Sequence, residues 1–290
     1  MAKAADKRGG IAAQYTRADA VRRVPLTIAV DAETKVSGVL ALPKGPVARP
    51  LAAAVVLGHG AGANMNQALL VAFQEGLAAR GAAVLRFNFV YTEAAKRAPD
   101  RPPLLIAAFR AAAKALAARP EAKGRVLVLG GKSMGGRIAS HVAALGDAAD
   151  GLVFLGYPLH PAGQPKKMRD AHLSDVPCPM LFLEGTRDPL CDLTLLRPVL
   201  ERIGPRASLH VIEGGDHSFA VPRASGRTPA DVTEELIGTT AEWLATLKAA
   251  RRPPAKDAAA SPPRVASRAP SSSTPRGGTR TPATGRAPRK

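Results

Sequence analysis

The sequence is poor in aromatic residues and in cysteine. Aromatic residues make up 4% of the 290 residues, whereas hydrophobic residues make up 46%. The core must therefore be mainly aliphatic, which is typical of a parallel sheet that is buried on both faces. The two cysteines, Cys178 and Cys191, provide neither a metal-binding spacing nor a disulfide framework. We therefore expect no metal, no other cofactor and a reducing, cytoplasmic location.

Long apolar runs are also missing. Because no run of about 18 apolar residues occurs, we expect no transmembrane helix and no membrane partner. The N-terminus is basic, with Lys3, Lys7 and Arg8, but polar residues interrupt the stretch that follows. A signal peptide would need an apolar segment at that place, so we predict none.

Negative charge is scarce, and the formal net charge is +18. Half of this excess lies in residues 251–290, which hold ten Lys or Arg and one Asp. Pro, Ala and Ser dominate this segment, which predicts a disordered basic tail. Because the tail lacks aromatic side chains for base stacking, we expect at most weak, salt-sensitive contact with polyanions. We assign residues 1–20 to a flexible arm and residues 21–250 to one folded domain.

The hydrophobic pattern predicts an α/β domain. Two segments of alternating polarity open it and indicate an antiparallel N-terminal hairpin. Short apolar segments then alternate with helical ones, which is typical of a mostly parallel central sheet with helices on both faces. The predicted strands are 24–30, 36–42, 52–57, 83–89, 125–130, 151–156, 179–184 and 207–212, and the predicted helices are 66–80, 103–119, 134–145, 193–203 and 229–249.

The strongest functional signal is Gly-Lys-Ser-Met-Gly at residues 131–135, between a buried strand and a helix. This context is typical of a nucleophile elbow, whose tight turn strains the serine and requires glycines beside it. We therefore predict Ser133 as a nucleophile. The same residues resemble the end of a phosphate-binding loop, but that motif needs a glycine where this chain has Val126.

A nucleophilic serine needs a base, and the base needs an acid that orients it. Asp188 and His217 each follow a buried strand, where the sites of open α/β sheets gather, and they come in the chain order Ser, acid, His. We predict Asp188 as the acid and His217 as the base. Glu184 and Asp192 are the alternatives for the acid, and we expect Asp216 to point elsewhere.

The oxyanion hole of such a site needs two backbone N–H groups. We predict Met134, directly after the nucleophile, and Ala61, which lies in a glycine-rich run after an early strand. We expect His59 to brace this run rather than to transfer protons. The alternative is that the run is only a flexible glycine turn.

These residues resemble the α/β-hydrolase superfamily, in particular its dienelactone-hydrolase-like branch. The likeness covers about residues 24–248 and implies an α/β-hydrolase fold with a Ser-His-Asp triad. Dienelactone hydrolases proper have Cys where this chain has Ser133, so lactone specificity is not implied. Residues 86–89, 130–137 and 156–159 also resemble a family of small hydrolase-like proteins that includes the testis-expressed protein 30 and a subunit of a histone acetyltransferase complex.

The expected activity is hydrolysis of a small-molecule ester or thioester through an acyl-enzyme. Only about twenty residues separate the strands 151–156 and 179–184, which predicts a short cap loop rather than a cap domain. Its basic residues would form a flap that favours acidic acyl groups, or simply a solvated loop; they are His160, Lys166, Lys167, Arg169 and His172. A catalytically idle interaction module stays open as the alternative function.

Overall fold

The structure is a computed structural model, and it describes residues 19–247. The predicted tail at 251–290 and nearly all of the predicted arm at 1–20 lie outside the described residues, so both stay predictions. Within residues 19–247, eight strands form one sheet: β1 (Val21–Ala29), β2 (Lys35–Pro43), β3 (Ala53–Gly58), β4 (Ala83–Phe87), β5 (Val126–Lys132), β6 (Gly151–Leu155), β7 (Met180–Gly185) and β8 (Ala207–Ile212).

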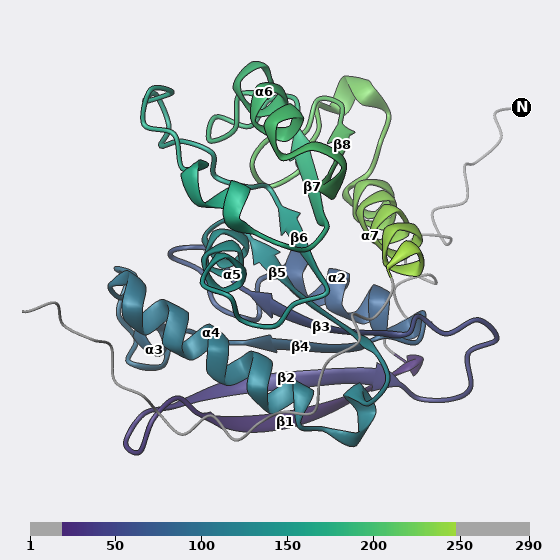
Figure 1. The fold of residues 1–290 in the computed structure, drawn as a ribbon. Helices are drawn as coiled ribbons and strands as arrows, with labels where there is room; N and C mark the ends of the chain where they lie inside the picture. Colours follow the sequence, from purple (N-terminus) through teal and green to yellow (C-terminus); the bar gives the residue numbers. More distant parts are fainter. Residues whose placement is uncertain (1–18, 248–290) are drawn as a thin grey trace, which may run out of the picture. The chain divides into compact units, whose positions relative to one another are not determined.

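The strands follow the order β1-β2-β4-β3-β5-β6-β7-β8 across the sheet. Strand β2 is antiparallel to both β1 and β4, and every other neighbouring pair is parallel. In Figure 1 the sheet runs from β1 at the bottom to β8 at the top. The predicted opening hairpin and the mostly parallel sheet are therefore confirmed.

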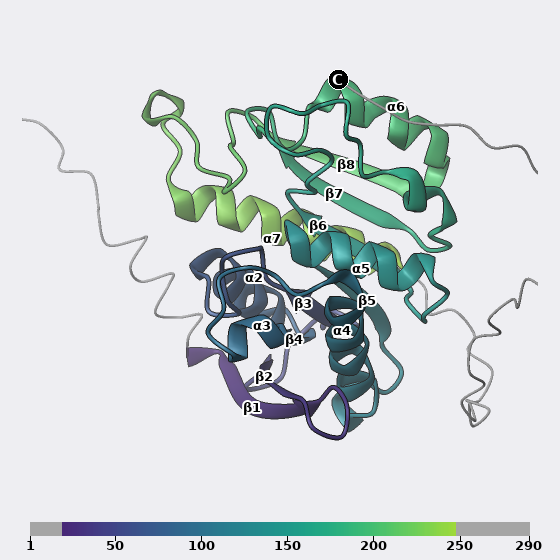
Figure 2. The same cartoon turned by 90° about the vertical axis from the view of Figure 1, so that its left-hand side faces the viewer.

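Helices cover both faces of the sheet (Figures 1 and 2). The α-helices are α2 (Ala68–Ala79), α3 (Val90–Glu93), α4 (Pro102–Ala117), α5 (Met134–Ala144), α6 (Leu193–Ile203) and α7 (Pro229–Thr246), and short 3-10 segments lie at Pro120–Ala122, Ala171–Asp175, Gly204–Arg206 and Arg223–Ser225. Helices α2 and α7 pack on one face, and α4, α5 and α6 pack on the other. None of the helices in the described range is long and apolar enough to cross a membrane.

Two aliphatic cores result, one on each face. Strands β3, β5 and β6 are buried at every position, because successive side chains point to opposite faces and helices cover both. Val128 of β5, for example, packs with α2 and α7, whereas the next residue, Leu129, packs with α4, α5 and α6. This arrangement explains the continuous apolar runs.

The predicted elements agree with the observed ones within a few residues, with two differences near the site. Strand β5 extends to Lys132 rather than ending at residue 130, and Gly131 pairs with neighbouring strands on both sides. The glycine pattern suggested an earlier turn, but here glycine permits close packing within the sheet. The four-residue helix α3 was not predicted, because so short an element shows no periodicity.

Candidate active site

The nucleophile elbow lies where β5 meets α5. Strand β5 ends at Lys132 and α5 begins at Met134, so Ser133 stands alone between them, with φ 51° and ψ −115°. A non-glycine residue at positive φ is strained and needs firm support from its surroundings. A β-carbon at Gly131 or Gly135 would lie 2.1 Å from the carbonyl oxygen of Gly58 in β3. Glycine at both places thus lets the strand, the turn and the helix pack closely.

Three of the predicted residues form a continuous chain of hydrogen bonds. The distance from Ser133 Oγ to His217 Nε2 is 2.8 Å. The distance from His217 Nδ1 to Asp188 Oδ2 is 2.6 Å. With His217 neutral, Nδ1–H donates to the carboxylate and leaves Nε2 free to accept the serine proton. The structure therefore brings together a hydroxyl, an imidazole and a carboxylate that are far apart in the sequence.

The loops that carry Asp188 and His217 are packed directly against each other. The backbone N–H of Arg187 donates to Gly215 O at 2.8 Å, and a β-carbon at Gly185 would lie 2.2 Å from the same oxygen. The side chain of Asp188 is fully buried, and its Oδ1 accepts from Leu190 N at 2.7 Å. These contacts fix the carboxylate before any ligand arrives.

The other carboxylates near the site have different partners. Glu184 is buried in β7, and its Oε1 accepts from Tyr157 N at 2.5 Å. Asp192 caps α6 by accepting from Thr194 N. Asp216 accepts from the backbone of residues 218 and 220, which shapes the loop around His217. Asp188 is thus the carboxylate that contacts the imidazole, and Asp216 points elsewhere, as expected.

The loop after β3 lies beside Ser133. A β-carbon at Gly60 would lie 3.7 Å from Ser133 Cβ, so Gly60 borders the serine. Ala61 is the next residue along the chain. His59 is fully buried; its Nδ1 bonds to Gly60 O at 2.9 Å, and its Nε2 accepts from Phe89 N at 3.2 Å. Burial lowers the pKa of His59, which favours the neutral ring. These bonds confirm that His59 braces the loop.

Further anchors of this loop escaped the sequence reasoning. Asn88 Oδ1 accepts from Met65 N at 2.9 Å, and Arg86 Nη1 donates to Asn66 Oδ1 at 3.3 Å. Both anchors lie at the end of β4 or directly after it, where an Arg and an Asn interrupt an apolar strand. That interruption was the signal that could have identified them.

Two buried ionisable groups near the triad were also missed. Lys132 is 3% exposed, and burial lowers the pKa of its ammonium to about 8. Burial, together with the nearby Asp188, raises the pKa of Glu184 well above its usual value. In the sequence, Lys132 reads as a turn residue, so its burial was not foreseeable, whereas the place of Glu184 at the end of a predicted buried strand could have indicated its burial.

The basic residues of the cap loop do not form one surface. Lys166 and Lys167 are exposed. His160 is buried and accepts from Asp192 N, and the backbone of Arg169 bonds to Leu159 and to the Tyr157 hydroxyl. His172 Nε2 lies 2.8 Å from Ser140 Oγ of α5. Three of the five predicted residues, His160, Arg169 and His172, thus bond to the rest of the protein or anchor the loop, and a basic flap would be formed mainly by the two lysines.

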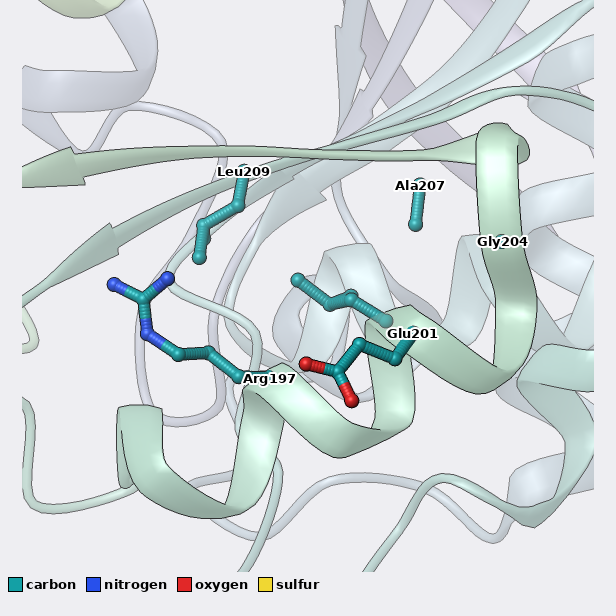
Figure 3. A pocket seen from close by; sticks show the side chains of 6 residues that line it. Arg197, Glu201, Gly204, Ala207 and Leu209 are labelled. Carbon is teal, nitrogen blue, oxygen red and sulfur yellow. The ribbon is translucent and has the colours of Figure 1, made fainter.

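A separate hollow of about 340 Å³ lies between α6 and the first half of β8. Figure 3 shows Arg197 and Glu201 on the helix side and Ala207 and Leu209 on the strand side. None of the predicted site residues lines it. Within residues 19–247, no group of three or more His, Cys, Asp or Glu is placed to hold a metal ion.

A serine in the tight turn directly after β5, with its hydrogen-bonded partners after β7 and β8 in this strand order, is typical of the class of α/β-hydrolase folds. The chain belongs to that family: a family model described as "Alpha/beta hydrolase domain" matches residues 51–245.

Solved structures of the same fold are similar over most of the chain. A dienelactone hydrolase from Anabaena variabilis has 21% identity and a TM-score of 0.61, with 79% of this chain and 99% of that chain covered. An α/β serine hydrolase without lid from Xanthomonas campestris has 21% identity and a TM-score of 0.61, with 77% and 95% covered. A cold-adapted esterase from an Arctic intertidal metagenomic library has 21% identity and a TM-score of 0.57, with 79% and 95% covered. At this identity the likeness concerns the fold.

Proposed function

We propose that the protein is a serine hydrolase that cleaves a carboxylic ester or thioester through an acyl-enzyme on Ser133. The observation that carries this proposal is the pair of hydrogen bonds that links Ser133 through His217 to Asp188. A serine hydroxyl is a weak nucleophile until a neighbouring base takes its proton. This arrangement supplies the base and the carboxylate that orients it.

The reaction runs in two halves. His217 Nε2 accepts the Ser133 proton while Oγ attacks the carbonyl carbon, and Asp188 stabilises the imidazolium that forms. The backbone N–H groups of Ala61 and Met134 donate to the oxyanion. His217 then returns the proton to the leaving alcohol or thiol, which leaves the acyl group on Ser133. In the second half, water gives a proton to His217 as it attacks the acyl carbon; the bond from the acyl carbon to Ser133 Oγ then breaks, His217 returns the proton to Oγ, and the carboxylic acid leaves.

The esterase assignment draws on the solved structures, because two of the similar proteins are a dienelactone hydrolase and an esterase. We do not extend lactone specificity to this chain, since it has Ser133 where dienelactone hydrolases proper have Cys. The segments at 86–89, 130–137 and 156–159 support the narrower proposal that it is a relative of the testis-expressed protein 30-like hydrolases.

We further propose a small-molecule substrate and a cytoplasmic location. Cys178 and Cys191 are both free and buried, which suits a reducing compartment. Burial raises the pKa of the Cys178 thiol to about 11, so this cysteine is unsuited to serve as a competing nucleophile.

Replacing the serine nucleophile tests this function. We expect Ser133→Ala to lose at least about 10³-fold in kcat/KM on a panel of acyl esters and thioesters, because the attacking oxygen is gone. A fluorophosphonate probe should label the wild type and not the variant. Ser208→Ala makes the same chemical change at an exposed position of β8 and should behave as wild type. Full activity in Ser133→Ala contradicts the mechanism, and a wild type that does not react with the probe favours the idle interaction module.

A further inference from the structure

Lys132 presents a buried charge directly beside the triad. It is the last residue of β5 and immediately precedes the nucleophile, yet it is 3% exposed. Its Nζ has no hydrogen-bond partner among residues 19–247. Lysine side chains normally extend until their ammonium group reaches water, and burying an ammonium group costs free energy unless other charges compensate it.

The ammonium group of Lys132 lies near the hydrogen bond between His217 and Asp188. A β-carbon placed at Gly156, directly after β6, would lie 3.0 Å from Lys132 Nζ, 3.4 Å from His217 Nδ1 and 3.5 Å from Asp188 Oδ2. All three atoms therefore surround one point. Gly156 has φ +70° and leaves this point empty, which gives the lysine room to reach the triad.

Several carboxyl groups face Lys132. Asp188 and Glu184 lie on the β7 side, and Asp216 lies in the loop after β8; each of the three favours the charged ammonium. The ring of Phe219 faces the ammonium group as well, with 5.7 Å from Nζ to the ring centroid.

Of these carboxyl groups, Asp188 is the one that is hydrogen-bonded to His217. Glu184 is fully buried, and burial raises the pKa of its carboxyl group well above the usual value. With a pKa of about 8, Lys132 is mostly protonated near pH 7. The buried ammonium therefore stands opposite the buried carboxylate of Asp188, with His217 beside both.

We propose that Lys132 is the counter-charge of Asp188, and that it keeps His217 in the neutral, proton-accepting form under more acidic conditions than Asp188 alone would allow. A bare buried carboxylate strongly favours an imidazolium beside it. An imidazolium cannot accept the Ser133 proton, so such a site would lose activity early as the pH falls. Lys132 thus acts through His217 as a positioning residue. This inference rests on the proposed function, since it assigns a role within the same triad.

The test is the pH profile of Ser133 labelling by a fluorophosphonate in wild type and Lys132→Met. This readout needs the base but no natural substrate. We expect the acidic limb of the profile to move to higher pH by about one unit in the variant, because a cation near the base is lost. The two profiles should converge above about pH 9, where the wild-type lysine is itself neutral. Lys114→Met removes the same charge from an exposed site on α4 and should leave the limb in place.

A purely structural role for Lys132 predicts a different result, in which the variant labels more slowly at every pH while the acidic limb stays in place. That result overturns the inference. Should Lys132→Met fail to fold, Lys132→Gln offers a polar replacement of similar length, and circular dichroism checks both variants. NMR of the histidine ring nitrogens follows protonation of His217 directly. A displaced titration of His217 without any labelling of Ser133 would support the counter-charge and contradict the hydrolase function, so the two failures are distinguishable.

Discussion

The glycines around Ser133 allow neighbouring backbone segments to pack closely; they do not make room for a substrate. Gly58, Gly131 and Gly135 come from β3, β5 and α5 and lie against one another, and a β-carbon at Gly131 or Gly135 would overlap the carbonyl of Gly58. The strained φ of Ser133 persists because this packing leaves the turn no alternative path. The position of Ser133 is therefore fixed by three elements together.

Substituting one of these glycines should damage both stability and activity. In Gly135→Ala the new carbon would meet the carbonyl of Gly58 at 2.1 Å, so the strand or the helix must shift. We expect a loss of about 3 kcal/mol in the free energy of unfolding and at least about a 100-fold loss of kcat/KM. Urea unfolding and ester hydrolysis measure the two effects.

Gly238 in α7 is the matched control. A β-carbon there meets nothing within 4 Å, and alanine is the better helix former, so Gly238→Ala should gain about 0.5–1 kcal/mol. If Gly135→Ala proved as stable as the wild type, the close approach of the strand and the helix would not be what requires glycine.

The residues that could be predicted from the sequence are those whose place relative to strands and helices is visible along the chain. The elbow pattern pointed to Ser133. Asp188 was preferred to Asp192 because Asp188 follows its strand by only a few residues. The surroundings of Lys132 were not predictable, because its partners come from β7 and from the loop after β8. Only the strand order, with β6 and Gly156 between them, brings these groups together.

At the scale of elements, α5 and the cap loop are joined by a pair of histidines. The rings of His141 on α5 and His172 on the loop are stacked with centroids 3.7 Å apart, and His172 Nε2 lies 2.8 Å from Ser140 Oγ. Burial lowers the pKa of both rings, that of His172 to about 4, with nearby Arg137 contributing. The sequence predicted the helix well, but it could not show that a loop histidine turns inward to meet it.

This histidine pair should make the domain sensitive to acid. His172 binds a proton with a pKa near 6.5 when the chain is unfolded but only near 4 when folded, so the unfolded state takes up more protons between these values. The stabilisation is complete above about pH 6.5 and is lost progressively as the pH falls toward 4, by about 2 kcal/mol.

Thermal or urea unfolding across pH 4–8 measures this dependence. His172→Phe keeps an aromatic ring against His141 but cannot titrate, so its stability should fall less steeply between pH 6.5 and 4. An unchanged slope in the variant would assign the acid sensitivity to other groups.

At the scale of the whole molecule, charge is unevenly distributed. Residues 251–290, which lie outside the described residues, carry half of the net charge of +18. The proposed triad lies entirely in the folded domain. Polyanion contact, where it occurs, should therefore belong to the tail and hydrolysis to the domain.

Deleting residues 251–290 tests this separation. We expect the truncated protein to hydrolyse esters within about twofold of the wild type and to lose any binding to single-stranded nucleic acid. Fluorescence anisotropy at 50 and 200 mM salt measures the binding of the full chain, which should weaken steeply as salt increases. Binding that survives the deletion would place the basic surface on the domain.

Strand β8 lies at the edge of the sheet, so the part of the candidate site that follows β8 should open locally more easily than the rest. Ser133 follows β5, which is buried at every residue, whereas His217 follows a strand that is mostly half-exposed and has β7 as its neighbour in the sheet. Local openings of a fold begin at such margins and leave the centre intact. On warming, the imidazole would separate from an elbow that is still fully formed. We therefore expect inactivation to precede global melting and to reverse on cooling, with the upper temperature limit of activity set by β8 rather than by the core.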